Sequence, residues 1–349
     1  NTAQVQGLRT TQVAAMSAAQ VAAIGTDDVA VMTTAQIAAL SATQMQAGVS
    51  TDQVLALSTT QVRALATTAV AALTTDQAVT LETSDMAALR TQQVAALSAT
   101  ALSVMSTAQL AALTSAGVAA LTSSQMQSLN TAQLAVLNPG GLSTTIIAAL
   151  TTQQLQSLGV SGVMALTTAQ VAALTSLQLP ALTTDQIAAL SSAQVSALST
   201  RALPALTTDQ FVAMETQDLA ALRSAQIAAL TTDQVANLTT DQIVALTTSQ
   251  VQALTTASIR ALTTDQVAAM ETTDLAALRT SQIAALTVPQ TQALTTNEIV
   301  ALTSLQVQAL TTSAIAALGT DQIAAMETRD LAALRTTQVV VLTPTQLPV

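Results

Sequence analysis

The chain has 349 residues with 9 basic and 19 acidic side chains, a net charge of −10, and no Cys, His, Trp or Tyr. All nine basic residues are Arg, and Phe211 is the one aromatic residue. This composition excludes a basic stripe for nucleic acid, thiolate or imidazole metal sites, and nucleophilic triads that need His. We therefore expect neither an enzyme nor a cofactor, and no uninterrupted apolar stretch is long enough for a membrane-spanning helix.

An eight-residue repeat, Thr-Thr-x-Gln-Val/Ile-x-Ala-Leu, runs through the whole chain when Leu is placed at position 8. Six octads cover residues 1–48, Val49 is one extra residue, eleven octads cover 50–137, and twenty-five cover 143–342 after the insert 138–142. Position 8 is Leu in 34 of these 42 octads, position 5 is apolar in all but one, and position 4 is Gln in 28. Positions 5 and 8 are therefore the predicted core, and position 4 has a specific polar role.

One long helix or a set of strands does not fit this period. Eight residues at 100° each leave a drift of roughly 80° per octad, so Leu would spiral around a single helix and form no coiled-coil seam. Positions 5 and 8 have opposite parity, so a strand would place them on opposite faces. Both readings leave the regular apolar positions without a common core.

A helix start in every octad does fit. Position 1 is mostly Thr, Ser, Asn or Gly, the residues preferred at a helix N-cap, and Gln three residues later completes a capping box. The preceding Leu and the Val or Ile at position 5 form a hydrophobic staple, and Asp at position 3 complements the helix dipole. A helix this short is unstable alone. The pattern predicts an all-α solenoid of very short capped helices built from eight-residue repeats, with Leu and Val inside and Thr and Gln at the corners.

Prolines and the insert mark the irregular places. Pro139 and Pro344 occupy position 2, where a helix tolerates Pro best. Pro180 and Pro204 occupy position 6, so either those octads have only one capped turn or their helices are shorter. The insert Asn138-Pro139-Gly140-Gly141-Leu142 predicts a corner or kink. The expected organisation is one continuous solenoid, with arrays over 1–137 and 143–349 on either side of the 138–142 insert.

A longer motif recurs every seven octads. TTDQVAAMETTDLAALRTSQIAAL begins at Thr263, and similar segments begin at Thr207 and Gly319, each 56 residues away, with a further copy from Thr74. Each copy has Glu at position 1 of one octad and Arg at position 1 of the next, giving the candidate inter-repeat charge pairs Glu82/Arg90, Glu215/Arg223, Glu271/Arg279 and Glu327/Arg335. Tandem duplication alone accounts for the period; alternatively, the charges set the register between turns or neighbouring chains.

Paired carboxylates are the nearest approach to a catalytic motif. They occur at Asp27-Asp28 and in each Glu-x-x-Asp, such as Glu271 and Asp274. Acid–base catalysis would need a pocket that shifts the pKa of one member. We expect instead carboxylates at helix starts that face water. A water-ordering face of regular Thr rows is a lesser alternative, because it needs a flat rigid surface.

The Leu-Thr-Thr-x-Gln-Val/Ile-x-Ala-Leu array resembles low-complexity segments of very large secreted surface proteins of Gram-negative bacteria, described as adhesin-like or haem-utilisation-like exoproteins. This resemblance covers the whole chain and implies an extracellular or cell-surface location and a structural role. It carries over no functional residue, and without His or Tyr a haem site is not expected.

The sequence favours a structural repeat protein that forms an extracellular stalk, fibre or matrix element. The alternative is a solenoid binding module of a surface adhesin, with a groove for a peptide or glycan. Both chain ends have the same repeat as the interior, so we expect the partner to be the rest of a longer chain or further copies, through end-to-end or lateral self-association into filaments.

Overall fold

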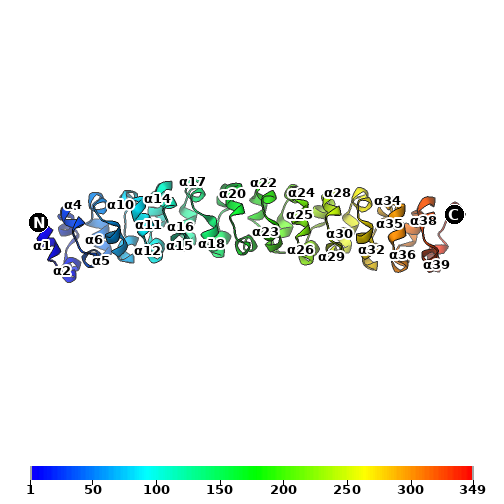
Figure 1. Cartoon of the computed structure of the whole chain (residues 1–349), viewed down its shortest axis with the longest axis horizontal. Coiled ribbons are helices and arrows are strands. Elements are labelled where there is room, and N and C mark those ends of the chain that lie inside the picture. Colours follow the sequence, from blue (N-terminus) through cyan, green and yellow to red (C-terminus); the bar gives the residue numbers. More distant parts are fainter. Residues whose placement is uncertain (1, 348–349) are drawn as a thin grey trace. The chain divides into compact units, whose positions relative to one another are not determined.

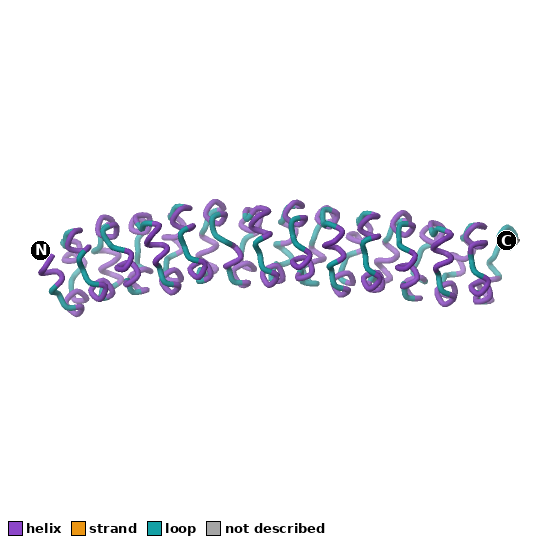
Figure 2. The backbone as a smooth tube through the Cα atoms, viewed as in Figure 1, coloured by secondary structure: helices purple, strands orange, loops and turns teal. Residues whose placement is uncertain are grey.

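The computed structural model describes residues 2–347, which contain forty α-helices of four to six residues, three 3-10 helices and no strand. Helices alternate with short loops throughout (Figures 1 and 2). The predicted all-α solenoid of short helices is confirmed. No described helix is long enough to cross a bilayer. Position 1 of the opening octad, Asn1, lies outside the described residues.

Two compact units make up the chain, with the boundary between Ala173 and Leu174. The insert 138–142 lies within the first unit. The helices of the first unit are α1 (Thr2–Gln6), α2 (Thr10–Ala15), α3 (Ala18–Ala22), α4 (Thr26–Ala30), α5 (Thr34–Ala38), α6 (Ala42–Ala47), α7 (Thr51–Leu55), α8 (Thr59–Ala64), α9 (Thr67–Ala71), α10 (Thr75–Thr80), α11 (Thr83–Ala88), α12 (Thr91–Ala96), α13 (Ala99–Val104), α14 (Thr107–Ala111), α15 (Ser115–Ala119), α16 (Ser123–Ser128), α17 (Thr131–Ala135), η1 (Pro139–Gly141), α18 (Thr144–Ala149), α19 (Thr152–Ser157), α20 (Gly159–Met164) and α21 (Thr168–Ala172).

The second unit has the same kind of helix. Its elements are η2 (Leu179–Ala181), α22 (Thr184–Ala188), α23 (Ser192–Ala197), η3 (Leu203–Ala205), α24 (Thr208–Val212), α25 (Thr216–Ala220), α26 (Ser224–Ala228), α27 (Thr232–Ala236), α28 (Thr240–Val244), α29 (Thr248–Ala253), α30 (Thr256–Ala261), α31 (Thr264–Ala268), α32 (Thr272–Ala277), α33 (Thr280–Ile283), α34 (Val288–Ala293), α35 (Thr296–Ala301), α36 (Ser304–Ala309), α37 (Thr312–Ala317), α38 (Thr320–Ala325), α39 (Thr328–Ala333) and α40 (Thr336–Val339).

Most helices begin where the capping box predicts, with position 1 as the N-cap; α20 is an exception, because it begins at Gly159, position 1 of its octad. At α28 the N-cap Thr239 has extended backbone angles of φ −71° and ψ 160°, and its hydroxyl oxygen accepts a hydrogen bond from the backbone N–H of Gln242 at 3.1 Å. The side-chain oxygen of Gln242 accepts in return from the backbone N–H of Thr239 at 3.0 Å. Two N–H groups that the helix leaves unpaired are thus satisfied within four residues.

Helices three octads apart pack side by side within each unit, such as α10 with α13 in the first and α26 with α29 in the second. The side-chain nitrogen of Gln at position 4 donates hydrogen bonds to carbonyl oxygens 28 and 31 residues earlier, as Gln242 does to Met214 and Phe211. These two acceptors are positions 8 and 5 of the octad four places earlier. One turn of the solenoid therefore contains between three and four octads, a number that the octad pattern alone did not provide.

Positions 5 and 8 form the core, as predicted. In the octad of α27, Val235 and Leu238 are buried, while Thr231, Thr232 and Asp233 are exposed. The expectation that Gln lies at the corners with Thr is wrong, because position 4 is buried beside position 5: Gln234 is 1% exposed. Its amide lies between two turns of the solenoid, where neighbouring backbone covers it.

Proline and the insert change helix type without interrupting the stacking. Pro180 and Pro204 lie in the 3-10 helices η2 and η3, which confirms the shorter helices predicted there. Where the sequence predicted a corner or kink, residues 138–142 form η1, a compressed repeat in which Pro139 is buried. Gln170 donates to the carbonyl oxygens of Pro139 at 2.8 Å and Leu142 at 2.6 Å, as other glutamines do to positions 5 and 8. Five residues thus replace a full octad in the stack.

The extra residue Val49 is accommodated by a close backbone approach at Gly48. A Cβ at position 48 would lie 2.7 Å from the carbonyl oxygen of Ala18, closer than side chains tolerate. Val49 then takes over the role of position 8, because its carbonyl oxygen accepts from Gln77 at 2.6 Å. Gly48 is the one non-apolar residue at position 8 because any larger side chain there would clash with the backbone of Ala18.

Candidate functional site

The four predicted charge pairs are at exposed N-cap positions of consecutive helices. Among residues 2–347 the ion pairs involve Arg329, with Glu327 at 2.7 Å and with Asp330 at 3.7 Å. The structure does not bring together Glu82 with Arg90, Glu215 with Arg223, Glu271 with Arg279, or Glu327 with Arg335. Adjacent octads are a quarter to a third of a turn apart, so their first residues point to different sides of the solenoid.

Two of these arginines instead bind backbone of the preceding turn. The Arg90 guanidinium donates to the carbonyl oxygen of Leu65 at 3.2 Å, and that of Arg335 donates to the carbonyl oxygen of Gln308. Arg has no side-chain acceptor, so at these caps the Gln half of the capping box is formed alone. The arginines therefore replace the cap hydroxyl with a contact between turns.

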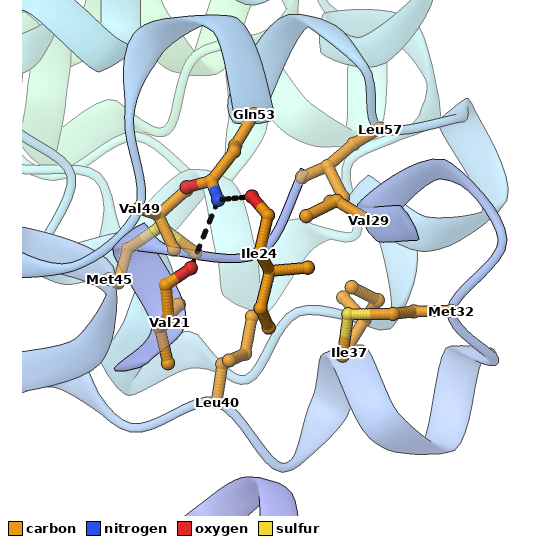
Figure 3. Close-up of a pocket in the computed structure, with 10 residues that line it drawn as sticks. All are labelled: Val21, Ile24, Val29, Met32, Ile37, Leu40, Met45, Val49, Gln53 and Leu57. Carbon is orange, nitrogen blue, oxygen red and sulfur yellow. Dashed lines mark hydrogen bonds between the residues drawn. The ribbon is translucent and has the colours of Figure 1, made fainter. Parts of the chain in front are cut away.

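The most regular polar feature is a ladder of position-4 glutamine amides between successive turns, which we call the glutamine ladder. Gln53 is a representative member (Figure 3): its side-chain N–H donates to the carbonyl oxygens of Val21 at 3.0 Å and Ile24 at 2.7 Å, both in the preceding turn. Its side-chain oxygen accepts from the backbone N–H of Ser50 at 2.8 Å. One amide thus caps its own helix and ties it to the turn below.

Only Gln supplies both functions at this length. The capping box accepts Glu as well as Gln, because it uses a side-chain oxygen. The bond to the preceding turn needs an N–H donor, which an ionised Glu lacks. The sequence contained this signal, since position 4 is Gln in 28 octads and Glu in one, but the octad interpretation used the capping role alone.

Aspartates of the Glu-x-x-Asp motifs take position 4 and use a different contact. Asp218 accepts from the hydroxyl of Ser192 at 2.6 Å, and Asp330 accepts from Ser304 at the same distance; each Ser lies 26 residues earlier, at position 2. The Asp side chain is too short to reach the carbonyl oxygens of the preceding turn as Gln does. Its carboxylate instead accepts a hydrogen bond from a hydroxyl group of that turn. The expectation that these carboxylates face water is wrong for the Asp, which is buried in all four motif copies.

Burial shifts the ionisation of two of these aspartates. For Asp274, desolvation raises the pKa above its usual value, the hydroxyl of Thr248 opposes the shift, and the nearby Glu271 adds to it. For Asp85, desolvation again raises the pKa, while the backbone N–H of Glu82 lowers it and the Glu82 carboxylate raises it. These shifts belong to carboxyls packed between turns of the solenoid.

An apolar cavity inside the first unit is too small for a ligand. The cavity between Val21, Met32, Ile37, Met45 and Leu57 measures about 10 Å³ (Figure 3). That volume is at the lower limit for one water molecule, and the lining is apolar. Across the described part of the chain, no three Asp or Glu side chains converge as metal ligands. Chemically, the glutamine ladder can bind backbone and hold turns together.

Matches to one family model, the ALTTAQ repeat, tile most of the chain. Ten overlapping matches cover residues 21–59, 50–83, 78–115, 147–184, 163–192, 181–214, 211–248, 245–272, 267–304 and 298–328. The chain belongs to the ALTTAQ repeat family. A search of curated proteins finds no match.

The letters of the ALTTAQ repeat coincide with the local unit that the structure uses. Residues 165–170 have this sequence, from the buried Leu166 through the cap Thr167 to the ladder residue Gln170. The repeat therefore combines the end of one octad with the start of the next. It contains the staple residue, the N-cap and the amide that binds the preceding turn.

Proposed function

We propose that the chain is a structural element of an extracellular or cell-surface protein, a stalk, fibre or matrix component, and that it has no catalytic activity. The observation that carries this proposal is the glutamine ladder, which joins turn to turn by the same bonds along each unit. A ladder with Gln in 28 of the 42 octads distributes these bonds along the chain and sets no octad apart as an active centre. The proposed location rests on the resemblance to repeats of secreted surface proteins.

Self-association is the second part of the proposal. Position 3 is mostly polar or Ala, but Leu177 and Leu305 occupy it with 78% and 67% of their surface exposed. An exposed Leu in a face of Thr, Ser and Gln offers an apolar contact to another copy of the chain. We therefore propose lateral association through these leucines.

Pulling single molecules tests the structural role. Because each turn contacts only its neighbours, the chain should resist extension and release its octads progressively, a few at a time. A chain that extends without resistance would rule out a stalk or fibre.

Light scattering at rising concentration tests self-association separately. The average mass should rise with concentration in the wild type and less so in a Leu177→Ser, Leu305→Ser variant, with Ser249→Ala as the control at position 3.

A binding module remains the second candidate because of one groove in the first unit. Arg63 and Arg90 line a surface groove of about 490 Å³ together with Thr91 and Thr114. Two guanidiniums beside hydroxyls suit a carboxylate-bearing sugar polymer. Calorimetric titration with a polyuronate would show binding that an Arg63→Ala, Arg90→Ala variant loses. No heat of binding in the wild type would remove this candidate.

A further inference from the structure

Glu298 is the one glutamate in the glutamine ladder. Its neighbours at position 4, one octad away on each side, follow the common register. Gln290 donates to the carbonyl oxygens of Ile259 at 2.8 Å and Leu262 at 2.6 Å, and Gln306 donates to those of Leu275 at 3.0 Å and Leu278 at 2.8 Å. The same spacing of 31 and 28 residues directs Glu298 toward the carbonyl oxygens of Val267 and Met270.

The two carboxyl oxygens of Glu298 have different surroundings. Oε2 accepts the backbone N–H of Thr295 at 2.6 Å, which is the capping contact made elsewhere by Gln. Oε1 is buried and has no hydrogen-bond partner. By the register of the neighbouring glutamines, we infer that Oε1 takes the place of their donating amide nitrogen. The whole residue is 2% exposed. An ionised carboxylate here would turn an unpaired acceptor toward two carbonyl oxygens, which costs free energy on burial.

A proton fits this place better than a metal ion. The ladder holds the amide nitrogen 2.6–3.0 Å from the carbonyl oxygens on both neighbouring octads. A hydrogen bond from a carboxyl O–H spans about 2.5–3.0 Å, the same distance. A calcium ion needs bonds of about 2.3–2.6 Å to each oxygen and several further ligands, so the oxygens around it would have to move apart.

The charged groups around α35 are almost all acidic. Helices α32 and α38 pack against α35 and carry Glu271, Asp274 and Asp321. Asp265 lies on α31, whose end supplies the facing carbonyls, and Arg279 follows α32. Burial is the main factor that raises the pKa of Glu298 above its usual value of 4.5, and the backbone N–H and hydroxyl of Thr295 oppose this shift.

We propose that Glu298 carries a proton in the folded chain and donates it to the carbonyl oxygens of Val267 and Met270, which makes this step of the ladder a proton-dependent joint. In acid, the joint is closed like the glutamine steps beside it. When the proton leaves, the carboxylate repels the facing carbonyls and the contact between α35 and the turn below loosens.

The direction of the pH effect follows from proton binding. In the unfolded chain Glu298 ionises near 4.5, and in the folded chain at a higher pH. Between these two values the unfolded chain binds fewer protons, so stability falls as the pH rises through this interval. The joint is therefore tightest in acid, below the usual pKa of 4.5, and it weakens as the pH rises through the raised pKa of Glu298 in the folded chain.

Hydrogen exchange of the full chain tests the joint, with rates corrected for the intrinsic effect of pH. Peptides covering 263–302 should open more readily at pH 8 than at pH 5 in the wild type. Glu298→Gln should slow exchange there at pH 8 by about tenfold and reduce the pH difference to the part that the buried Asp274 contributes. Gln306→Glu, the matched reverse change one octad away, should introduce a pH difference in peptides covering 303–310, which do not contain Glu298. Exchange that is independent of pH in the wild type, or faster at pH 8 in Glu298→Gln, would overturn the proposal.

Infrared spectroscopy provides an independent readout of the proton. At pH 5.5 an ordinary Glu is mostly ionised. The difference spectrum of wild type minus Glu298→Gln should therefore contain the carbonyl stretch of one protonated carboxyl group. Absence of this band at pH 5.5 would show that Glu298 is ionised and would contradict the proposed joint.

Discussion

The side chain of Gln at position 4 both caps the start of its own helix and binds the preceding turn of the solenoid. Its oxygen belongs to the local capping box, whereas its nitrogen donates to backbone one turn away. Each such bond contributes about 0.5–1.5 kcal/mol to stability, but leaving its buried partners unsatisfied costs about 1–3 kcal/mol. A residue that lacks either of the two groups loses one of these contacts, which accounts for the prevalence of Gln at position 4, in 28 of the 42 octads.

Adjacent glutamines in α12 allow this cost to be measured. Gln93 is buried, with its nitrogen 3.0 Å from the carbonyl oxygen of Val62 and 2.9 Å from that of Leu65, while Gln92 is exposed. Gln93→Leu removes the amide's bonds to both carbonyl oxygens and leaves the buried end of the capping box, the backbone N–H of Arg90, without its acceptor. We expect a loss of about 1–3 kcal/mol in the free energy of unfolding, measured by denaturant titration.

Gln92→Leu is the matched control, one residue away in the same helix. It changes an exposed side chain and should alter stability by no more than about 0.5 kcal/mol. Equal effects of the two substitutions would show that the ladder does not stabilise the fold.

At the scale of the element, helix length is limited by the next helix start. Each helix spans four to six residues, too few to be stable in isolation, and the cap of the following octad turns the chain. The Leu that precedes most caps is buried and packs into the core, whereas Leu8, Leu334 and Leu342 near the chain ends are half-buried. Cap and Leu together therefore set the corner, and helix propensity has a minor part.

The corner before α29 provides a test of these two contributions. Thr247 accepts from the backbone N–H of Gln250 at 3.4 Å, and Leu246 is buried next to it. Thr247→Ala should cost about 1 kcal/mol through loss of the cap. Leu246→Ala should cost more, about 2–5 kcal/mol, because it leaves a cavity in the core. Thermal melts of both variants check this order, and two silent substitutions would contradict the assigned octad frame.

At the scale of the whole molecule, charge contributes little direct attraction. The ion pairs among residues 2–347 all involve Arg329, while the net charge of the chain is −10. Stability comes instead from the apolar core and the glutamine ladder, neither of which depends on salt. Repulsion among excess acids remains as the main electrostatic effect and opposes the folded state.

Stability should therefore rise slightly with ionic strength. Raising NaCl from about 0.05 to 0.5 M shortens the screening length from roughly 14 to 4 Å, which weakens repulsion between exposed carboxylates. The midpoint of thermal unfolding should increase, and choline chloride should have the same effect if screening is the cause. A lower midpoint in both salts would show that ion pairs stabilise the fold after all.

The sequence by itself determined the helix starts, the buried positions 5 and 8 and the all-α class. These follow from contacts within about four residues, such as Thr239 with Gln242, which repeat in almost every octad and so are visible in the pattern. The seven-octad Glu and Arg motif is equally visible, but adjacent octads point in different directions and its charge pairs do not form in the structure.

Tertiary structure alone decided the number of octads per turn, the second bond of each Gln, the burial of Glu298 and the place of the 138–142 insert. All four depend on residues 25 to 32 positions apart that meet only when the solenoid closes a turn. A local pattern does not encode that distance, because the same capped octad is compatible with turns of different size. Packing of Leu and Val in the core selects the turn, and the amide nitrogens of Gln then find their carbonyl partners.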